Sequence, residues 1–265
     1  MMHTLFVGLM LLRVFLQAIP VREYVCHHTD SPIVVDGSLD EPAWDRAPRS
    51  EPFCDIRGET WPQPRYGTWV KMLRDETHLY IAALIEEPCV KAALLEHDAI
   101  IWRENDFEVF LDPDGDGRLY FEFEINALGT VLDLVMDKPY AEGGKYFIPW
   151  DCRGLQSAVR ISPAGRDFAG GWTVEMAIPF ASLAVGGVDP GGLSTWRINF
   201  SRVEWLREGG PEENWVWAPT GEVDIHRPDR WGKLLFAPPA MPGSAPPVMP
   251  GLTGHLTPGC NDIPH

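Results

Sequence analysis

The sequence has little positive charge and no basic cluster. Its 22 Lys and Arg residues stand against 38 Asp and Glu residues, which gives a formal net charge of −16. This balance disfavours nucleic acid and anionic membrane surfaces as partners, because both would be repelled. No GxSxG, HExxH or Gly-rich phosphate-binding motif occurs. The sequence therefore predicts no nucleotide cofactor and no known catalytic constellation.

The cysteines form no recognisable metal or redox motif. The chain has five of them, Cys26, Cys54, Cys89, Cys152 and Cys260, and no CxxC pair. An odd number leaves at least one thiol unpaired within a monomer, so a complete disulfide framework is excluded. We expect zero or one disulfide bond.

Long hydrophobic runs are also missing. Leu5–Leu12 is apolar, but it is too short to cross a bilayer, so no integral membrane span is predicted. The run has the length of a signal-peptide core, which predicts that residues 1–21 are a signal peptide or an N-terminal extension and that the protein is secreted or in the cell envelope. An over-extended start of translation is the alternative. Residues 238–265 are rich in Pro and Gly and predict a disordered tail, which leaves 22–237 as the folded domain.

What the chain has in abundance is turn residues and tryptophan. It contains 25 Pro, 25 Gly and 11 Trp. Short strand patterns separated by turns run through the middle of the chain, and only residues 92–97 and 180–184 suggest short helical turns. In Leu119–Asn126, for example, Phe121, Phe123 and Ile125 alternate with polar residues. These patterns predict an all-β fold, a two-sheet antiparallel sandwich of the immunoglobulin-like or jelly-roll-like kind, with very short helical turns.

One acidic turn is a candidate metal site. Asp112, Asp114 and Asp116 alternate with Pro113 and Gly115, so one tight loop could surround a hard cation with carboxylate oxygens. The twelfth position of an EF-hand would be Glu, but here it is Phe123, and strand patterns flank the loop. The turn is therefore either a lone calcium-binding turn or a plain acidic hairpin loop.

Two carboxylates on one strand could form a hydrolytic pair. Glu122 and Glu124 point the same way at a separation of about 7 Å. This spacing is compatible with paired catalytic carboxylates. Charge at every second position is, however, the usual pattern of a solvated sheet face, and we expect that outcome for both residues.

The tryptophans divide by their sequence context. Trp44, Trp69, Trp172 and Trp196 lie in apolar strand patterns and are expected in the core, whereas five others have polar neighbours: Trp102, Trp150, Trp205, Trp215 and Trp217. An exposed indole can stack on the C–H-rich face of a pyranose ring, while nearby polar groups bind the sugar hydroxyls. We expect at least one tryptophan of this second group to face a ligand.

Six short motifs, read together, resemble a known family. They occur in the order Val35–Trp44, Leu79–Ala82, Asn105–Asp112, Gly171–Pro179, Asn199–Arg202 and Trp231–Leu234. In order and spacing the chain resembles the family 9 carbohydrate-binding module, in its DOMON-related β-sandwich superfamily. The resemblance covers about residues 30–236 and implies a non-catalytic sugar-binding domain, known best as an appendage of xylanases and often carrying calcium.

The resemblance also implies site residues. In the family two tryptophans sandwich a terminal sugar, and the first of them corresponds to Trp102, six residues before the sugar-contacting Glu108. A further sugar-contacting position corresponds to Asn126. Two positions depart from the pattern: Ile225 stands where the second tryptophan is expected, and Glu124 stands where the family has an arginine. Trp215 or Trp217 could supply the missing aromatic face.

The leading hypothesis is therefore binding of a sugar or polysaccharide without turnover, associated with glycan or xylan catabolism. A haem-binding domain is an alternative, because related sandwiches include cytochrome domains with axial Met, His or Lys ligands. The sequence has no CxxCH motif for covalent attachment, and we do not expect haem. The candidate axial ligands are His78, His97, His226, Met72, Met136 and Met176. A weak hydrolytic role as a glycoside hydrolase accessory chain is the third alternative. The sequence leaves the oligomeric state open.

Overall fold

The computed structural model describes residues 21–163, 170–185, 195–206 and 210–238. The predicted extension over 1–21 and the predicted tail over 238–265 lie outside these residues, except for residues 21 and 238 themselves. Thirteen strands occur in the described part of the chain: β1 (Glu23–His28), β2 (Cys54–Asp55), β3 (Thr68–Arg74), β4 (His78–Glu86), β5 (Asp106–Asp112), β6 (Tyr120–Asn126), β7 (Val131–Met136), β8 (Tyr146–Phe147), β9 (Gln156–Ser162), β10 (Gly171–Pro179), β11 (Thr195–Glu204), β12 (Glu213–Val216) and β13 (Gly232–Phe236).

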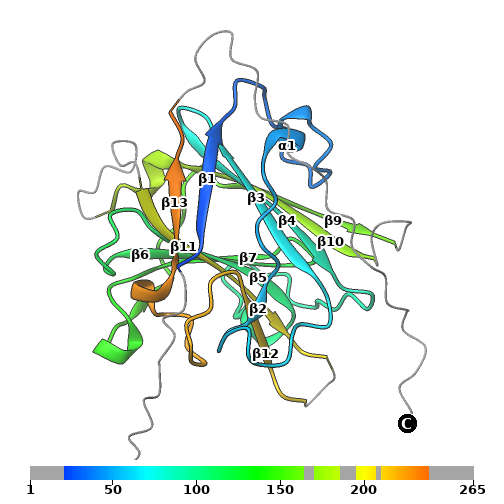
Figure 1. The fold of residues 1–265 in the computed structure, drawn as a ribbon, viewed down its shortest axis with the longest axis vertical. Helices are drawn as coiled ribbons and strands as arrows, with labels where there is room; N and C mark the ends of the chain where they lie inside the picture. The colour runs from blue at the N-terminus through cyan, green and yellow to red at the C-terminus, as the bar shows by residue number, and fades with distance from the viewer. Residues whose placement is uncertain (1–20, 164–169, 186–194, 207–209, 239–265) are drawn as a thin grey trace, which may run out of the picture.

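The strands form two packed layers that share β1 (Figure 1). One layer runs in the order β8-β7-β6-β5-β11-β13-β1, and the other in the order β1-β3-β4-β10-β9. β12 pairs with the end of β11 and with β2. The predicted all-β sandwich is confirmed. Its ladders are antiparallel apart from those of β1, which pairs in parallel with β13 through Glu23–Cys26 and with β3 through His27 and His28.

The main core lies between the two layers. The odd-numbered residues of β5 and β6 face it, and Phe107, Val109, Phe121 and Phe123 are completely or almost completely buried there. From the opposite layer β4 and β10 contribute residues such as Trp172. This alternation follows from the pleat of a strand, in which successive side chains point to opposite faces.

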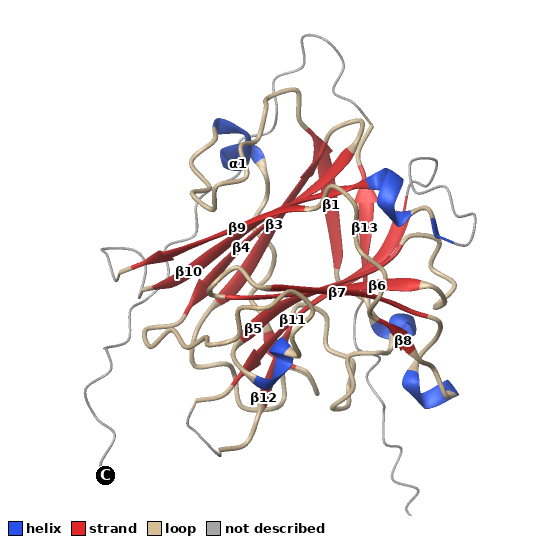
Figure 2. Cartoon of the chain, turned by 180° about the vertical axis from the view of Figure 1, so that it is seen from behind, coloured by secondary structure: helices blue, strands red, loops and turns tan. Residues whose placement is uncertain are grey.

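Helical structure is limited to single turns (Figure 2). The described helices are α1 (Pro42–Arg46) and the 3₁₀ turns η1 (Ile101–Arg103), η2 (Tyr140–Glu142), η3 (Phe180–Leu183) and η6 (Pro228–Arg230). The turn expected at 180–184 is present as η3, but residues 92–97 form no helix, so that prediction was wrong. Among the described residues, no helix has the length and apolar character needed to cross a bilayer.

Glu175 on β10 binds the segment before α1 to the layer that contains β3, β4, β10 and β9. Its Oε2 accepts hydrogen bonds from the backbone N–H groups of Asp36 and Gly37, both at 3.0 Å, and its Oε1 accepts one from Trp44 Nε1 at 2.8 Å. Gly37 has φ of +79°, a conformation that glycine adopts without strain. Two distant sequence motifs thus meet in one buried hydrogen-bond network.

The tryptophans expected in the core are mostly there. Trp44, Trp172 and Trp196 are fully buried, and Trp69 is half-buried. Of the cysteines, Cys26, Cys54 and Cys152 are free and buried. Burial raises the pKa of each of these thiols, to about 12 for Cys152, so they are unreactive packing residues at neutral pH.

Candidate functional site

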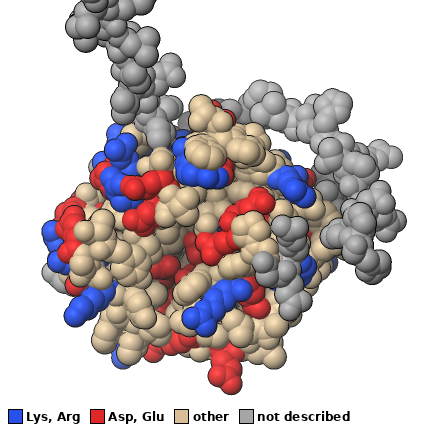
Figure 3. Space-filling model, turned by 90° about the horizontal axis from the view of Figure 1, so that it is seen from below, with Lys and Arg blue, Asp and Glu red and all other residues tan. Residues whose placement is uncertain are grey.

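A cavity of about 350 Å³ opens on the outer face of the layer that contains β5 and β6. Its floor is formed by the even-numbered residues of these strands, which point away from the main core. Its walls come from loops that rise over the sheet: η1, the segment around η2 and β8, and residues 223–226. Figure 3 shows the molecule from below, and several Asp and Glu side chains lie close together on this face.

A second, smaller apolar cluster supports the floor. It includes Phe110 on β5, Tyr120 on β6, Leu132 and Leu134 on β7, and Trp231 after η6. The ring of Trp231 lies 5.1 Å from that of Tyr120 and 5.6 Å from that of Phe110, between ring centroids. This cluster holds the covering loops on the outer face, so the acidic positions beside it lie at the base of a cavity instead of on an open sheet.

Glu108, Glu122 and Glu124 form that acidic base. All three line the cavity and are nearly completely buried. The expectation that Glu122 and Glu124 lie on a solvated sheet face was therefore wrong, because loops distant in sequence cover this part of the sheet. Glu108 is the register partner of Glu124. Asp106, at the start of β5, is buried beside them, and carboxylate oxygens of Asp106, Glu108 and Glu124 lie within 4.8 Å of one another.

The carboxyl groups at the base have raised pKa values. Loss of water around the buried groups is the main cause, and repulsion among the carboxylates adds to it. The pKa of Glu108 rises to about 8 and that of Glu122, through burial, to about 7. The pKa values of Asp106 and Glu124 are also raised, well above their usual range. The base of the cavity can therefore both accept and donate hydrogen bonds near neutral pH.

Trp102 stands at the wall of the cavity. It lies in η1, its side chain is 41% exposed, and its backbone N–H donates to Glu124 Oε2 at 3.2 Å. The backbone carbonyl of Trp102 accepts a bond from Trp205 Nε1 at 3.4 Å. The indole predicted to face a ligand is thus accessible, and it lies directly beside the acidic base.

Asn126 does not line the cavity. Its Nδ2 donates to the carbonyl of Leu94 at 2.9 Å and to Glu104 Oε1 at 2.6 Å, and its Oδ1 accepts from the N–H groups of Leu128 and Thr130, both at 3.0 Å. Every polar atom of this amide is used within the protein. Asn126 therefore fixes the loop that leads to Trp102, and its amide has no free polar atom to offer a ligand.

Trp215 and Trp217 also lie away from the cavity. On β12 the alternation of side chains points Asn214 into the cavity and Trp215 into the core, where the guanidinium of Arg202 lies 4.9 Å from its ring centroid. Trp217 is fully buried and donates from Nε1 to Glu51 Oε2 at 3.1 Å. The prediction that one of them supplies a second aromatic face needs correction, since a buried indole offers no surface to a sugar.

Two tyrosines that sequence reasoning missed supply aromatic surface instead. Tyr140 in η2 and Tyr146 in β8 both line the cavity, and both side chains are exposed. Ile225, which stands where the family has a tryptophan, lies in the wall as well. No strand-like pattern marks residues 138–148, and nothing in the local sequence shows that this loop folds back over β6.

The three aspartates of the predicted metal turn do come together. Oxygens of Asp112, Asp114 and Asp116 lie within 4.8 Å of one another. Asp112 is buried, and its carboxylate accepts hydrogen bonds from the N–H groups of Gly115 and Gly117 at 3.1 and 2.9 Å. Burial raises its pKa to about 7. Three carboxylates around one turn fit a hard cation such as calcium, and the same hydrogen bonds fit a plain acidic turn.

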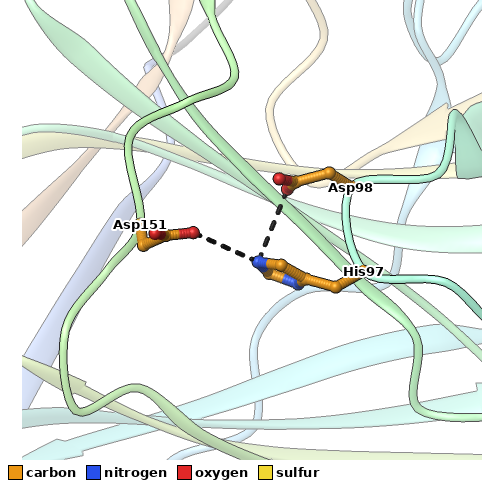
Figure 4. Close-up of side chains that lie close together, drawn as sticks. All are labelled: His97, Asp98 and Asp151. Carbon is orange, nitrogen blue, oxygen red and sulfur yellow. Dashed lines mark hydrogen bonds and ion pairs between the residues drawn. The ribbon is translucent and has the colours of Figure 1, made fainter.

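A second polar cluster surrounds His97 and includes Asp133, which lies opposite Phe123 and so on the core-facing side of β7. His97 Nε2 is 3.5 Å from Asp98 Oδ1 and 3.3 Å from Asp151 Oδ1 (Figure 4), and it also lies 3.5 Å from Asp133 Oδ1. Hydrogen bonding to Asp151 and the surrounding carboxylates raise the pKa of His97, against the opposing effect of burial. A protonated imidazole accounts for this arrangement without a metal ion.

The candidate haem ligands lie apart from the cavity, with one exception. Met72 and Met176 are fully buried in the main core, and Met136 is fully buried in the smaller cluster. His226 lines the cavity, where its Nδ1 lies 3.0 Å from the hydroxyl of Tyr120. Burial lowers the pKa of His226 to about 4, so this imidazole is neutral at physiological pH.

Solved structures of other proteins share this fold. A protein from Bacteroides uniformis ATCC 8492, proposed to bind carbohydrate, is 18% identical, with a TM-score of 0.61 over 82% of this chain and 100% of that one. A family 9 carbohydrate-binding module from Caldicellulosiruptor kristjanssonii, in complexes with cellotriose and with glucose, is 14% identical, with TM-scores of 0.59 over 86% and 85% of this chain and 100% of each of those chains.

At these identities the structural likeness establishes the fold. A search of curated proteins gives no significant match. The family assignment rests on the sequence itself, because the family model described as "carbohydrate family 9 binding domain-like" matches residues 35–237, which contain all six motifs. The chain therefore belongs to the carbohydrate family 9 binding domain-like family.

Proposed function

We propose that the cavity over β5 and β6 binds a sugar unit of a glycan and does not transform it. The observation that carries the proposal is the position of Trp102, whose exposed indole stands beside the buried carboxyl groups of Glu108 and Glu124 in one cavity. An apolar ring face next to polar hydrogen-bonding groups matches the two kinds of surface that a pyranose presents.

The size and family of the site support the same proposal. The cavity volume of about 350 Å³ falls in the range of about 300–1,000 Å³ that is typical of small-molecule sites. The similar module from Caldicellulosiruptor kristjanssonii has been solved with cellotriose and with glucose, so this fold accommodates such ligands. Tyr140 and Tyr146 would replace, in this chain, the second aromatic face that the family pattern places at Ile225.

The proposal extends to the setting of the protein. The apolar run Leu5–Leu12 supports export, and the family resemblance supports a role in recognising a polysaccharide such as xylan outside the cytoplasm. Calcium at Asp112, Asp114 and Asp116 would stabilise the turn between β5 and β6 and so the strands that carry Glu108 and Glu124. Its role would be structural, since these aspartates do not line the cavity.

The test is calorimetric titration of the full chain with glucose, cellotriose, xylotriose and the corresponding amino sugars. Binding of at least one of these, weakened tenfold or more by Trp102→Ala, would support the proposal. Trp61→Ala is the matched control, because Trp61 has a similar exposure of 45% but lies outside the cavity. Equal affinities for Trp102→Ala and the unchanged protein would disprove the site.

A further inference from the structure

The described residues that line the cavity carry charges of one sign, although the guanidinium of Arg103, which is not among them, lies 5.3 Å from the ring centroid of Trp102. The described lining residues include no Lys and no Arg, and they carry five carboxyl groups: Glu108, Glu122, Glu124, Glu212 and Asp224. His226, which also lines the cavity, is neutral at pH 7 because burial lowers its pKa to about 4. A site built only for neutral sugars has no need of such an excess, since amides and hydroxyls also bind sugar hydroxyls.

In the part of the chain that the structure describes, the carboxyl groups at the base have no counter-charge. Within the described residues, no ion pair reaches any of Asp106, Glu108, Glu122 or Glu124. Asp106 is completely buried, its Oδ1 accepts a bond from the N–H of Val203 at 3.2 Å, and its Oδ2 has no hydrogen-bond partner. Carboxylates this close together in a poorly solvated site repel one another, so the cluster favours binding either protons or a cation.

Elsewhere the same sheet neutralises its buried acids internally. Arg202 on β11 is fully buried, and its Nη2 lies 2.5 Å from Glu204 Oε2 and 3.7 Å from Glu87 Oε2. At the family position where the resemblance implies an arginine near the sugar, this chain has Glu124 instead. The cavity therefore differs from the neighbouring charge network in one respect: none of the described residues that line it supplies a positive charge.

We propose that the cavity selects a sugar that carries a protonated amino group, with the ammonium held between Glu108 and Glu124 and the ring face against Trp102. This inference rests on the proposed function of the same cavity. An ammonium donates up to three hydrogen bonds, and bonds between charged groups are about twice as strong as neutral ones. The aromatic face of Tyr140 also attracts a cation, which neutral sugars cannot exploit, whereas the ring of Trp102 already has the guanidinium of Arg103 at 5.3 Å from its centroid.

Proton linkage gives the proposal a distinctive signature. In the free protein, burial and mutual repulsion hold protons on the base, with the pKa of Glu108 at about 8 and that of Glu122 at about 7. A bound ammonium lowers these pKa values, so its binding near pH 7 releases protons. A neutral sugar brings no charge and releases few. The titratable groups around the bound ammonium would be Asp106 and Glu108 on β5, Glu122 and Glu124 on β6, Glu212 before β12, Asp224 and His226 on the 223–226 loop, and Tyr140 and Tyr146 on the wall.

The experiment titrates the full-length chain at pH 7 with three trisaccharides that share a β-1,4-linked pyranose backbone. These are β-1,4-linked glucosamine, its fully N-acetylated form and cellotriose. We expect the glucosamine trimer to bind at least tenfold more tightly than the two neutral trimers. Titration in two buffers of different ionisation enthalpy should show proton release for the glucosamine trimer and little for cellotriose.

Two variants connect the preference to the base. Glu108→Gln and Glu124→Gln should each weaken binding of the glucosamine trimer at least tenfold and change cellotriose binding less than threefold. Glu96→Gln is the control, because Glu96 is exposed and lies outside the cavity. Thermal unfolding of each variant shows that it is folded; both substitutions remove repulsion and should keep the domain stable.

Three results would overturn the inference. Equal affinities for charged and neutral trimers would refute the amine preference and leave sugar binding in place. Binding of CaCl₂ alone, abolished by Glu124→Gln, with no amine preference, would make the base a metal site. If no sugar binds, both the proposed function and the inference are refuted.

Discussion

Glu108 and Glu124 are cross-strand partners on the outer face of β5 and β6, and both are almost completely buried without an ion-pair partner among the described residues. Like charges placed opposite each other in a sheet are destabilising. The protein therefore retains a costly arrangement at the base of its cavity, as expected where function and stability make opposing demands.

The stability of the free protein should fall as pH rises from about 6.5 to 8. Glu108 has a folded-state pKa of about 8 and Glu122 of about 7, whereas unfolded glutamates titrate near pH 4.3. Between these values the folded state binds more protons than the unfolded state, so the free energy of unfolding decreases with pH. His226, with its pKa of about 4, acts in the opposite sense below pH 6.5, which sets the lower limit of the window.

Denaturant unfolding at half-unit steps of pH measures this slope. Glu108→Gln should flatten it, because the substituted side chain no longer titrates. A free energy of unfolding that stays constant or increases across the window in the unchanged protein would contradict the assignment of protons to the base.

The same substitution should have opposite effects at two buried glutamates. Glu124→Gln removes a buried carboxyl group that lies opposite Glu108, and we expect it to raise the free energy of unfolding at pH 8 by up to about 1 kcal/mol, the upper end for one cross-strand pair. Glu175→Gln should lower it by about 1–3 kcal/mol, because both carboxylate oxygens accept from fixed donors and an amide can satisfy only some of them. Denaturant unfolding at pH 8 measures both variants. Changes in the free energy of unfolding that have the same sign in the two variants would refute this prediction.

Arg202 should be essential for stability. Replacing it with Met leaves Glu204 and Glu87 buried without their cation, and breaking such a pair costs about 3–5 kcal/mol. The indole of Trp215 also loses its guanidinium partner. Denaturant unfolding of Arg202→Met is the measurement, with Arg118→Met as an exposed ion-pair control that should change by less than about 1 kcal/mol. Equal losses in the two variants would show that burial of the pair has no special cost.

Tyr146 and Phe147 form a matched pair for the cavity wall. They are neighbours in β8 with similar exposures of 54% and 59%, but only Tyr146 lines the cavity. Tyr146→Ala should weaken binding of whichever sugar proves to be the ligand by about fivefold to tenfold, whereas Phe147→Ala should leave it unchanged. Calorimetric titration measures both affinities. An equal effect of the two substitutions would mean that Tyr146 does not contact the sugar.

Calcium should raise the melting temperature if it binds at the turn after β5. A ligand present at 100 times its dissociation constant stabilises the folded state by about 2.7 kcal/mol. We expect CaCl₂ to stabilise the unchanged protein and an Asp151→Asn variant, and to have no effect on an Asp114→Asn, Asp116→Asn double variant. Scanning calorimetry with CaCl₂ and with a chelator makes the test. Loss of the effect in Asp151→Asn instead would place the ion beside His97.

Much of the fold could be read from local patterns. The alternation of Phe121, Phe123 and Ile125 with polar residues predicted a strand with one buried face, and the structure shows that strand in β6. The family motifs placed Trp102 six residues before Glu108, and the structure brings both to one cavity. Such features depend on contacts within a strand or between adjacent strands, which short sequence patterns encode.

The sequence by itself determined the all-β class, the apolar face that each strand packs into the main core and the acidic character of the chain, because strand periodicity and charge are local properties. Only the tertiary structure decided which polar face is solvated. Glu122 and Glu124 became the buried base of a cavity because loops bearing Tyr140, Tyr146 and Ile225 fold over them. Trp215 and Trp217 became core residues because β12 and the residues after it present those indoles inward. Burial depends on what a distant segment covers, and a single strand's alternation carries no information about that.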